Sequence, residues 1–368
     1  MKTILHTIDT TGPGGAETVF IELATRLPKD KYRSVVVIRG KGWVYDELCR
    51  RGVIPNLLNA KGSFNLRYIL GLRKIIQSEG VDLIQSHLLG TNVYCSLVGL
   101  LTGKPVITAF HGAVDINEIE RFLTLKFGLI NTGASKIVAV SESLRDEMTS
   151  RTSLNRQKTI VIHNGIDPVA FERSKSNELR QRFGWNQEDI IVGSLGNIRL
   201  AKGYDVLLKA AAKLVHSNNS FRFVVAGEGK SNGLYEELLQ LRKELELQSR
   251  VKFLGFVDDP ASFLSNLNLF LLPSISEGFS ISTIQAMASM VPVIVTSSGG
   301  PEEIVTHQEN GWMVDKGNSA AIAAALEYLG ANPDICADIS KKAKEKVVDV
   351  FSMDSMLEKY EKIYSNYC

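Results

Sequence analysis

Residues 190–216 read IIVGSLGNIRLAKGYDVLLKAAAKLVH, and the interpretation of the fold starts from this stretch. Its first six residues are an apolar, β-branched run that predicts a buried strand. A loop containing Gly196 and Gly203 follows, and residues 204–216 then carry apolar side chains at the spacing of an amphipathic helix. The stretch therefore predicts one strand–loop–helix unit of an α/β protein.

The same order of segments recurs along nearly the whole chain. In the first half, strand-like runs lie at 3–8, 34–38, 83–86, 106–109, 136–140 and 159–162. In the second half, they lie at 190–195, 221–226, 251–254, 269–272, 293–295 and 312–314. Helical patterns such as 16–27 and 66–78 separate them. This alternation predicts parallel sheets covered by helices on both faces.

The alternation pauses once, at residues 163–168, which read HNGIDP. Asn-Gly and Asp-Pro are turn-forming pairs, and Pro168 cannot extend a helix or a central strand. A chain of 368 residues also exceeds what one hydrophobic core usually serves. We therefore expect two Rossmann-like domains facing a cleft, at 1–167 and 168–350, with ligands at the carboxyl ends of their strands.

Two cations lie in the loop after the run at 190–195. Arg199 and Lys202 are three residues apart, just before the predicted helix at 204. A guanidinium, an ammonium and a helix N-terminus together would bind a diphosphate and stabilise it as a leaving group without a metal. Two solvated basic side chains are the alternative interpretation.

A glycine-rich loop, Gly12-Pro13-Gly14-Gly15-Ala16-Glu17, follows the first strand and opens a helix. Such glycines let the backbone approach a phosphate, but a plain tight turn explains the pattern equally well. Glu17 stands where the dinucleotide fingerprint requires its third glycine, which argues against a pyridine-nucleotide dehydrogenase.

Glu277-Gly278-Phe279-Ser280-Ile281 follows the run at 269–272, and a helix continues through Gln285. The Glu277 carboxylate can accept hydrogen bonds from sugar hydroxyls, although an acidic residue at a helix start is also common for its effect on the dipole. Gln285 would lie roughly 12 Å further along a helix, which suits two ends of one elongated ligand better than one metal.

Neither a metal nor another cofactor is expected. Asp258-Asp259-Pro260 is better explained as a helix cap before a proline at the first helical position. The four cysteines, at positions 49, 95, 336 and 368, lack zinc spacing and predict reduced thiols. With no secretory signal and apolar runs about half the length of a membrane span, the expected compartment is the cytoplasm.

The charge is unevenly distributed. Residues 1–167 hold 21 Lys and Arg against 15 Asp and Glu, whereas the remainder holds 21 against 25. Random scatter is one explanation. The other is a basic first domain that approaches an anionic acceptor or the inner face of the cytoplasmic membrane as a peripheral protein. Nucleic acid is not an expected partner, because no cluster of Lys, Arg and aromatic residues stands out.

In this order, the segments resemble the retaining GT-B glycosyltransferases of glycosyltransferase family 4. The resemblance covers essentially the whole chain, and its order and spacing are highly specific. It is carried by Gly14-Gly15-Ala16-Glu17, Phe110-His111-Gly112, Val140-Ser141-Glu142-Ser143, His163-Asn164-Gly165-Ile166-Asp167, Arg199 to Gly203, Ala226-Gly227-Glu228-Gly229, Glu277 to Gln285, Gly299-Gly300 and Phe351-Ser352. It implies that residues 351–368 form a final helix that crosses back to the first domain.

The resemblance also implies roles for single residues. Gly15 would approach the donor phosphate, Arg199 and Lys202 would neutralise it, and Glu277 would hold the transferred sugar. His111 would contribute a hydrogen bond near the reacting face. A lone histidine is more often structural, but the place of His111 in Phe110-His111-Gly112, directly after a strand, favours the functional role. The other implied donor-binding residues are Gly14, Gly227, Phe256, Phe279, Ser280, Ile281 and Gln285, with the base read by backbone near Phe256.

The implied reaction is transfer of a sugar, with retention, from a UDP-sugar or a GDP-sugar to a glycolipid or polysaccharide acceptor, with the UDP-sugar favoured. One departure from the family is Gln285, where a glutamate is usual; losing charge assistance would weaken ribose binding by roughly 1 kcal/mol. A sugar-nucleotide epimerase with the same architecture and a catalytically silent scaffold remain as alternatives.

Overall fold

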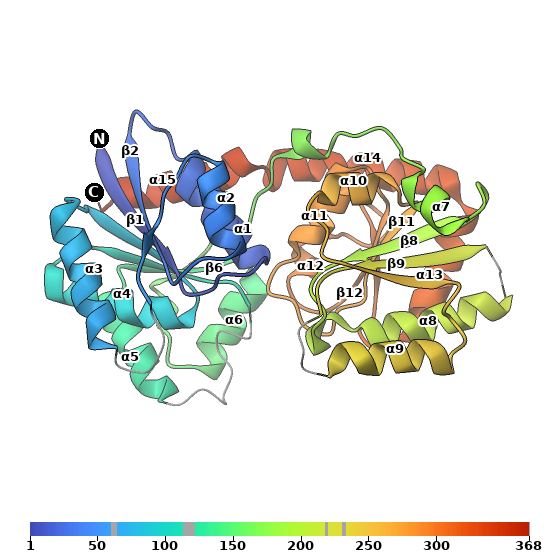
Figure 1. Cartoon of the computed structure of the whole chain (residues 1–368), viewed down its shortest axis with the longest axis horizontal. Coiled ribbons are helices and arrows are strands. Elements are labelled where there is room, and N and C mark those ends of the chain that lie inside the picture. Colours follow the sequence, from blue (N-terminus) through green and yellow to red (C-terminus); the bar gives the residue numbers. More distant parts are fainter. Residues whose placement is uncertain (60–64, 113–121, 218–219, 230–232, 368) are drawn as a thin grey trace. The chain divides into compact units, whose positions relative to one another are not determined.

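The computed structural model describes residues 1–59, 65–112, 122–217, 220–229 and 233–367. The chain forms two compact units (Figure 1), which we call unit 1 (Met1–Gly165 with Asp354–Cys368) and unit 2 (Ile166–Met353). The sequence predicts divisions after residues 167 and 350, which differ from these by two and three residues. Cys368, the last residue of the predicted terminal helix, lies outside the described residues.

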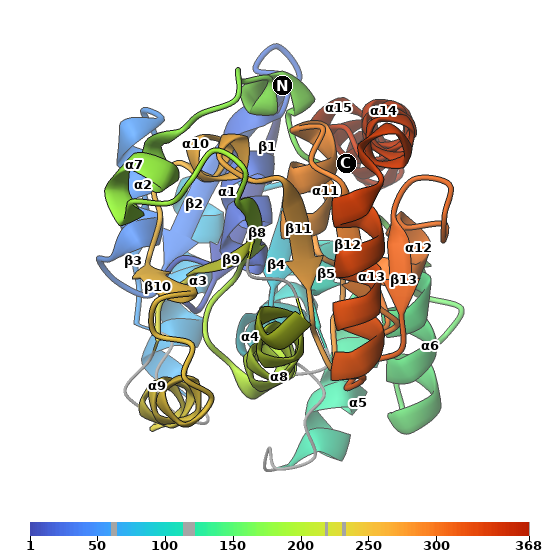
Figure 2. The same cartoon turned by 90° about the vertical axis from the view of Figure 1, so that its right-hand side faces the viewer.

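Unit 1 is built on a parallel sheet of seven strands in the order β3-β2-β1-β4-β5-β6-β7. Helices α1 and α2 cover one face, and α3, α4 and α5 cover the other (Figures 1 and 2). Its elements are β1 (Lys2–Ile8), α1 (Gly15–Arg26), β2 (Tyr32–Ile38), α2 (Trp43–Arg50), β3 (Asn56–Leu57), α3 (Leu66–Ser78), β4 (Leu83–His87), α4 (Leu89–Thr102), β5 (Val106–Phe110), α5 (Leu123–Gly133), β6 (Lys136–Ala139), α6 (Glu142–Arg151) and β7 (Thr159–Val161).

Unit 2 is built on a parallel sheet of six strands in the order β10-β9-β8-β11-β12-β13. Helices α10, α11 and α14 cover one face, and α8, α9 and α13 the other (Figure 1). Its elements are η2 (Pro168–Phe171), α7 (Glu178–Phe183), β8 (Ile190–Leu195), η3 (Leu200–Lys202), α8 (Tyr204–Ser217), β9 (Phe221–Ala226), α9 (Leu234–Glu244), β10 (Val251–Gly255), α10 (Pro260–Ser265), β11 (Leu269–Leu272), α11 (Ile281–Ala288), β12 (Val293–Thr296), α12 (Pro301–Ile304), β13 (Trp312–Val314), α13 (Ser319–Ala331) and α14 (Pro333–Val350).

Strands that helices cover on both faces bury nearly all of their side chains. In β11, all four residues of Leu269–Leu272 are buried, and each such side chain contributes roughly 1.5–3 kcal/mol relative to an exposed one. The predicted fold class, two Rossmann-like parallel-sheet domains, is confirmed. The short strand β3 was not predicted, because its two exposed residues carry no apolar pattern.

The last helix, α15 (Met353–Ser365), belongs to unit 1 for nearly all of its length. Tyr360 and Tyr364 are 1% and 0% exposed, and the Tyr364 ring meets the Tyr32 ring edge to face with 6.0 Å between centroids. The predicted return of the terminal helix to the first domain is therefore confirmed, and α15 completes the core of that unit.

Each sheet has one topological switch point, where the strand order reverses direction. It lies between β1 and β4 in unit 1 and between β8 and β11 in unit 2. Loops after two such strands diverge to opposite faces and leave a crevice at the carboxyl ends, which is where ligands bind in sheets of this kind.

Two further observations concern the helices and the thiols. None of the helices in the described part of the chain combines the length and the apolar composition needed to span a bilayer. Cys49, Cys95 and Cys336, the described cysteines, are all free thiols.

Candidate functional site

Backbone hydrogen bonds tie together the loops at the carboxyl edge of the unit 2 sheet. The loop after β8 is bonded to the loops after β9 and β11, and the loop after β11 is bonded to the loop after β12. These bonds run from Ile198 N to Glu228 O (2.9 Å), from Ile275 N to Ala201 O (2.7 Å), from Glu277 N to Ser298 O (2.9 Å) and from Gly300 N to Glu277 O (3.0 Å). The loops that carry the predicted site residues therefore form one bonded network.

An ion pair bridges the switch point of unit 2. Lys202, from the loop after β8, places Nζ 2.5 Å from Oε1 of Glu277, which comes from the loop after β11. Ser274 donates its hydroxyl to the same carboxylate oxygen over 2.6 Å. The side chains of Lys202 and Glu277 are only 20% and 9% exposed. A cation and an oriented carboxylate thus share the position where a ligand is expected.

Arg199 adds a second cation to this edge. It is exposed, directly precedes η3, and forms no ion pair with any residue that the structure describes. Tyr204, the first residue of α8, donates its hydroxyl to the Gly196 carbonyl over 2.7 Å and so holds the loop against the helix. The predicted order of strand, basic loop and helix N-terminus is found here.

Gly227 allows two loops to approach backbone to backbone. A Cβ atom at this position would lie 1.9 Å from the carbonyl oxygen of Gly196, so any larger residue would push the loops apart. The Gly227 amide donates to the Gly255 carbonyl over 2.8 Å, which brings in the loop after β10. Phe256 follows in that loop and is 42% exposed.

Helix α11 begins in the same network. Ser280 is buried and caps the helix, since its hydroxyl accepts from the Thr283 amide over 3.3 Å. The first amides of a helix, here from Ile281 onward, have no partner within the helix. The Phe279 ring packs edge to face on Phe351, 5.5 Å between centroids, so this side chain serves the core. Gln285 is half-buried in the second turn.

In unit 1, His111 follows β5 directly and meets a second histidine. His87 is the last residue of β4, and its Nδ1 lies 2.9 Å from His111 Nε2. The rings stack, with 5.2 Å between centroids and 19° between planes. Burial lowers the pKa of His111 to about 4 and holds the pKa of His87 well below its usual value. Both imidazoles are therefore neutral at pH 7.

The loop after β1 lies at the switch point of unit 1. Burial raises the pKa of the Asp9 carboxyl to about 6, against smaller opposing effects of backbone hydrogen bonds and of Arg39. The carboxylate approaches the start of α4 so closely that a Cβ atom on Gly90 would lie 2.1 Å from it. In the same loop, the Glu17 carboxylate folds back over Gly14, beside Gly15, at the start of α1.

The structure adds three residues that the sequence motifs did not indicate: Ser274, His87 and Asp9. Each is a polar residue at, or just beyond, the carboxyl end of an apolar strand, and that position is the signal that could have identified them. The cap interpretation of Asp259 is confirmed, because its carboxylate accepts from the Ser262 amide over 3.0 Å. Among the described residues, no three His, Cys, Asp or Glu side chains are grouped as metal ligands.

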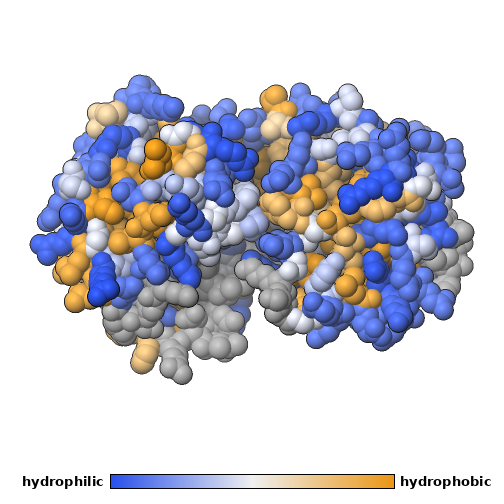
Figure 3. Space-filling model, viewed as in Figure 1, coloured by the Kyte–Doolittle hydropathy of each residue, from blue (hydrophilic) through white to orange (hydrophobic). Residues whose placement is uncertain are grey.

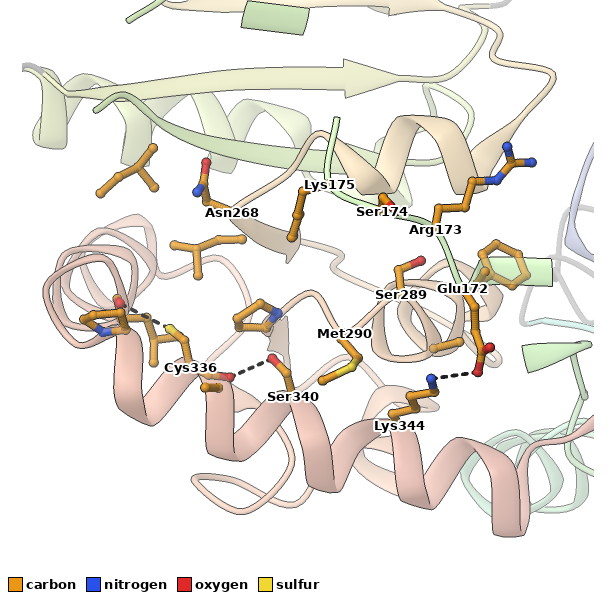
Figure 4. Close-up of a pocket in the computed structure, with 18 of the residues that line it drawn as sticks. Glu172, Arg173, Ser174, Lys175, Asn268, Ser289, Met290, Cys336, Ser340 and Lys344 are labelled. Carbon is orange, nitrogen blue, oxygen red and sulfur yellow. Dashed lines mark hydrogen bonds and ion pairs between the residues drawn. The ribbon is translucent and has the colours of Figure 1, made fainter. Parts of the chain in front are cut away.

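A cavity of about 780 Å³ lies at the opposite edge of the unit 2 sheet. It is lined by Ile190 and Leu269, the first residues of β8 and β11, and by helix α14. Figure 4 shows Lys344 of α14 paired there with Glu172, 2.8 Å between nitrogen and oxygen. None of the predicted site residues lines this cavity.

The raised pKa of Asp9 gives a pH-dependent stability. A carboxyl with a higher pKa in the folded state binds its proton more tightly when folded, so unit 1 loses stability as pH rises from about 4 through 6. Relative to Asp9→Asn, the wild type should lose up to about 3 kcal/mol between pH 4 and pH 8. Urea unfolding at both pH values measures this difference. Asp30→Asn, at an exposed position, is the control; an equal difference for Asp9→Asn at both pH values would contradict the prediction.

The chain is similar to known proteins over nearly its whole length. The family model described as Glycosyltransferase Family 4 matches residues 13–169, and the model described as Glycosyl transferases group 1 matches residues 175–346. N-acetyl-alpha-D-glucosaminyl L-malate synthase of Bacillus anthracis is 27% identical, over 82% of this chain and 79% of the relative. The capsular polysaccharide biosynthesis glycosyltransferase CapM of Staphylococcus aureus is 28% identical, over 86% and 84%.

Among solved structures, Anabaena HepE in complex with UDP and glucose has a TM-score of 0.89 and 22% identity, over 100% of both chains. At this identity the likeness concerns the fold. The two family models follow one another from residue 13 to residue 346, one for each parallel-sheet unit. The chain therefore belongs to the GT-B glycosyltransferases of the group 1 and family 4 type.

Proposed function

We propose that this enzyme transfers a sugar, with retention, from a nucleoside-diphosphate sugar to a glycan or glycolipid acceptor. The observation that carries the proposal is the Lys202–Glu277 pair across the switch point of unit 2. It offers a cation for the diphosphate and a carboxylate for the sugar hydroxyls in adjacent positions. Arg199 is the second cation for the diphosphate.

The bound donor would exchange one ion pair for another. When the diphosphate binds, its oxygens compete with Glu277 for the Lys202 ammonium, and the carboxylate then accepts hydrogen bonds from the sugar. As the bond between the sugar and the diphosphate breaks, negative charge grows on the leaving oxygen, where Lys202 and Arg199 stabilise it. The acceptor hydroxyl attacks from the face that the diphosphate leaves and gives its proton to the leaving diphosphate oxygen, which retains the configuration. His111 would contribute a hydrogen bond near that face.

We favour a UDP-sugar as the donor and a glycan as the acceptor because of the proteins that this chain resembles. HepE, which shares the fold, was crystallised with UDP and glucose. The relatives named above include a capsular polysaccharide biosynthesis enzyme, which supports a glycan acceptor. Gln285, on the second turn of α11, is our candidate for the ribose, because an amide can accept from one hydroxyl and donate to another.

Two substitutions separate the sugar end of the donor from its nucleotide end. Glu277→Gln should lower kcat on the order of 100-fold, the effect of losing one transition-state contact, while UDP alone binds within threefold of the wild type. Gln285→Ala should weaken UDP binding by about 1 kcal/mol, and Gln285→Glu should tighten it by a similar amount. Calorimetric titration of UDP and kinetics with UDP-sugars measure both effects.

Gln181→Ala, at an exposed position of α7, is the matched control and should change neither quantity. Loss of UDP binding in Glu277→Gln, with no change in either Gln285 variant, would reverse the assignment of the two ends. Absence of any binding by the wild type to UDP or GDP would favour a silent scaffold.

The reaction should not require a metal ion, because Arg199, Lys202 and the starts of α8 and α11 supply the positive charge that stabilises the leaving diphosphate. We expect turnover in excess EDTA to equal turnover without it. A loss of activity on chelation that magnesium or manganese restores would show that a metal carries this charge instead.

We further propose that unit 1 approaches an anionic membrane through the surface of α3 and β3. Ile54, Leu57, Leu66 and Leu70 are exposed there, at 84%, 48%, 64% and 54%. Figure 3 shows apolar and hydrophilic residues intermixed over the area where Figure 1 labels α3. Arg67, Arg73 and Lys74 are exposed on the same helix. Apolar side chains flanked by cations favour the interface of an anionic bilayer.

Sedimentation with vesicles tests this surface. The wild type should bind vesicles containing anionic lipid, less so at high salt, and Leu66→Ser with Leu70→Ser should weaken that binding. Leu101→Ser, at an equally exposed leucine of α4, should leave it unchanged. Equal binding to neutral vesicles, or an equal loss in the Leu101 variant, would contradict the proposed surface.

A further inference from the structure

A chain of hydrogen bonds between buried side chains runs from α15 to His111 within unit 1. We propose that this chain fixes His111 in the tautomer that carries its proton on Nδ1, which makes His87 and Gln85 positioning residues. The tautomer follows from geometry in unit 1 alone; its effect on catalysis rests on the function proposed above.

The orientation of the Gln85 amide is fixed by two partners. The Tyr364 hydroxyl of α15 donates to Gln85 Oε1 over 3.1 Å. The other end of the amide lies 3.4 Å from the carbonyl oxygen of Ser86, which can only accept, so this end is the nitrogen. Gln85 is fully buried in β4, so water does not compete for either group.

The amide orientation then determines the tautomer of His87. Gln85 Nε2 lies 3.4 Å from His87 Nε2, and because the amide nitrogen only donates, His87 Nε2 must accept. Burial keeps the pKa of His87 well below its usual value, so the ring is neutral and carries one proton. That proton is therefore on Nδ1.

The same reasoning extends to His111. His87 Nδ1 lies 2.9 Å from His111 Nε2, and since the proton is on His87, His111 Nε2 accepts it as a hydrogen bond. Burial lowers the pKa of His111 to about 4, so this ring is also neutral and keeps its one proton on Nδ1. His111 thus presents an N–H donor, suited to an oxygen of the donor or acceptor sugar, in place of a lone pair.

Packing around the His87 ring also prevents a ring flip that would exchange its two nitrogens. Phe20 meets the His87 ring edge to face with 5.5 Å between centroids, and the ring is fully buried, so it cannot turn over without displacing the core. A third histidine, His6 on β1, is also buried, and burial lowers its pKa to about 3, so it adds no cation. All hydrogen bonds of this series therefore donate in one direction, from Tyr364 of α15 toward His111.

The test is direct detection of the tautomers. Nitrogen-15 NMR of protein labelled in histidine, at pH 7.5, should show both His87 and His111 with protonated Nδ1 and unprotonated Nε2. His87→Phe keeps the ring and removes the donor, so the His111 proton should shift partly or wholly to Nε2 and kcat should fall on the order of 100-fold with little change in KM. The His111 resonances are assigned by their absence in His111→Asn.

Two further variants separate tautomer control from packing. His87→Asn keeps an amide donor near the position of Nδ1 and should keep the wild-type tautomer of His111 and most of kcat. Tyr364→Phe removes the hydroxyl but leaves Gln85 oriented by the Ser86 carbonyl. His87 and His111 should therefore each keep the wild-type tautomer. A wild-type His111 with its proton on Nε2, or an unchanged tautomer in His87→Phe, would overturn the proposal. A shifted tautomer with unchanged kcat would instead refute the catalytic part and the role given to His111.

Discussion

The ion pair between Lys202 and Glu277 is the contact around which the loops at the carboxyl edge of unit 2 are arranged. It joins the loops after β8 and β11, whose strands are neighbours in the sheet but are separated in sequence by two strands and three α-helices. Taking two charges out of water is costly unless their other bonds are satisfied, and the Ser274 hydroxyl meets part of this requirement. Backbone bonds between the surrounding loops hold both side chains in place. The charges of Lys202 and Glu277 thus balance each other, and Arg199 adds a further positive charge at the same edge.

The two units carry different kinds of polar side chains at the carboxyl ends of their strands. Unit 2 places opposite charges at its switch point, whereas unit 1 places neutral imidazoles after β4 and β5 and a partly protonated carboxyl after β1. The difference follows from burial. His87 is fully buried at a strand end, where a charge would lack water, while Lys202 keeps 20% of its side chain exposed. The ion pair thus lies at the switch point of unit 2, whereas the neutral imidazoles lie at the strand ends of unit 1.

Sequence reasoning was strong for the segments and weak for contacts between them. The alternation of strands and helices predicts both sheets. It also predicts the basic loop at 199–202 between a strand and a helix, which are β8 and α8 in the structure. His87 could not be predicted, because its meaning depends on His111, which is 24 residues away and one strand over. The motif groups Phe279 with the donor site through its backbone amide, whereas the packing of its ring on Phe351 depends on the end of α14, far along the chain. Ser274 likewise gains its role from Glu277.

The division of the chain has a consequence for how the protein is made. Unit 2 is one continuous segment, but unit 1 is interrupted and is finished only by residues 354–368. During synthesis, the core that receives Tyr360 and Tyr364 therefore stays incomplete until α15 leaves the ribosome, after the whole of unit 2. A chain that lacks residues 354–368 would hold a complete unit 2 and an unfinished unit 1. The folding of unit 1 thus depends on a segment that is made after unit 2.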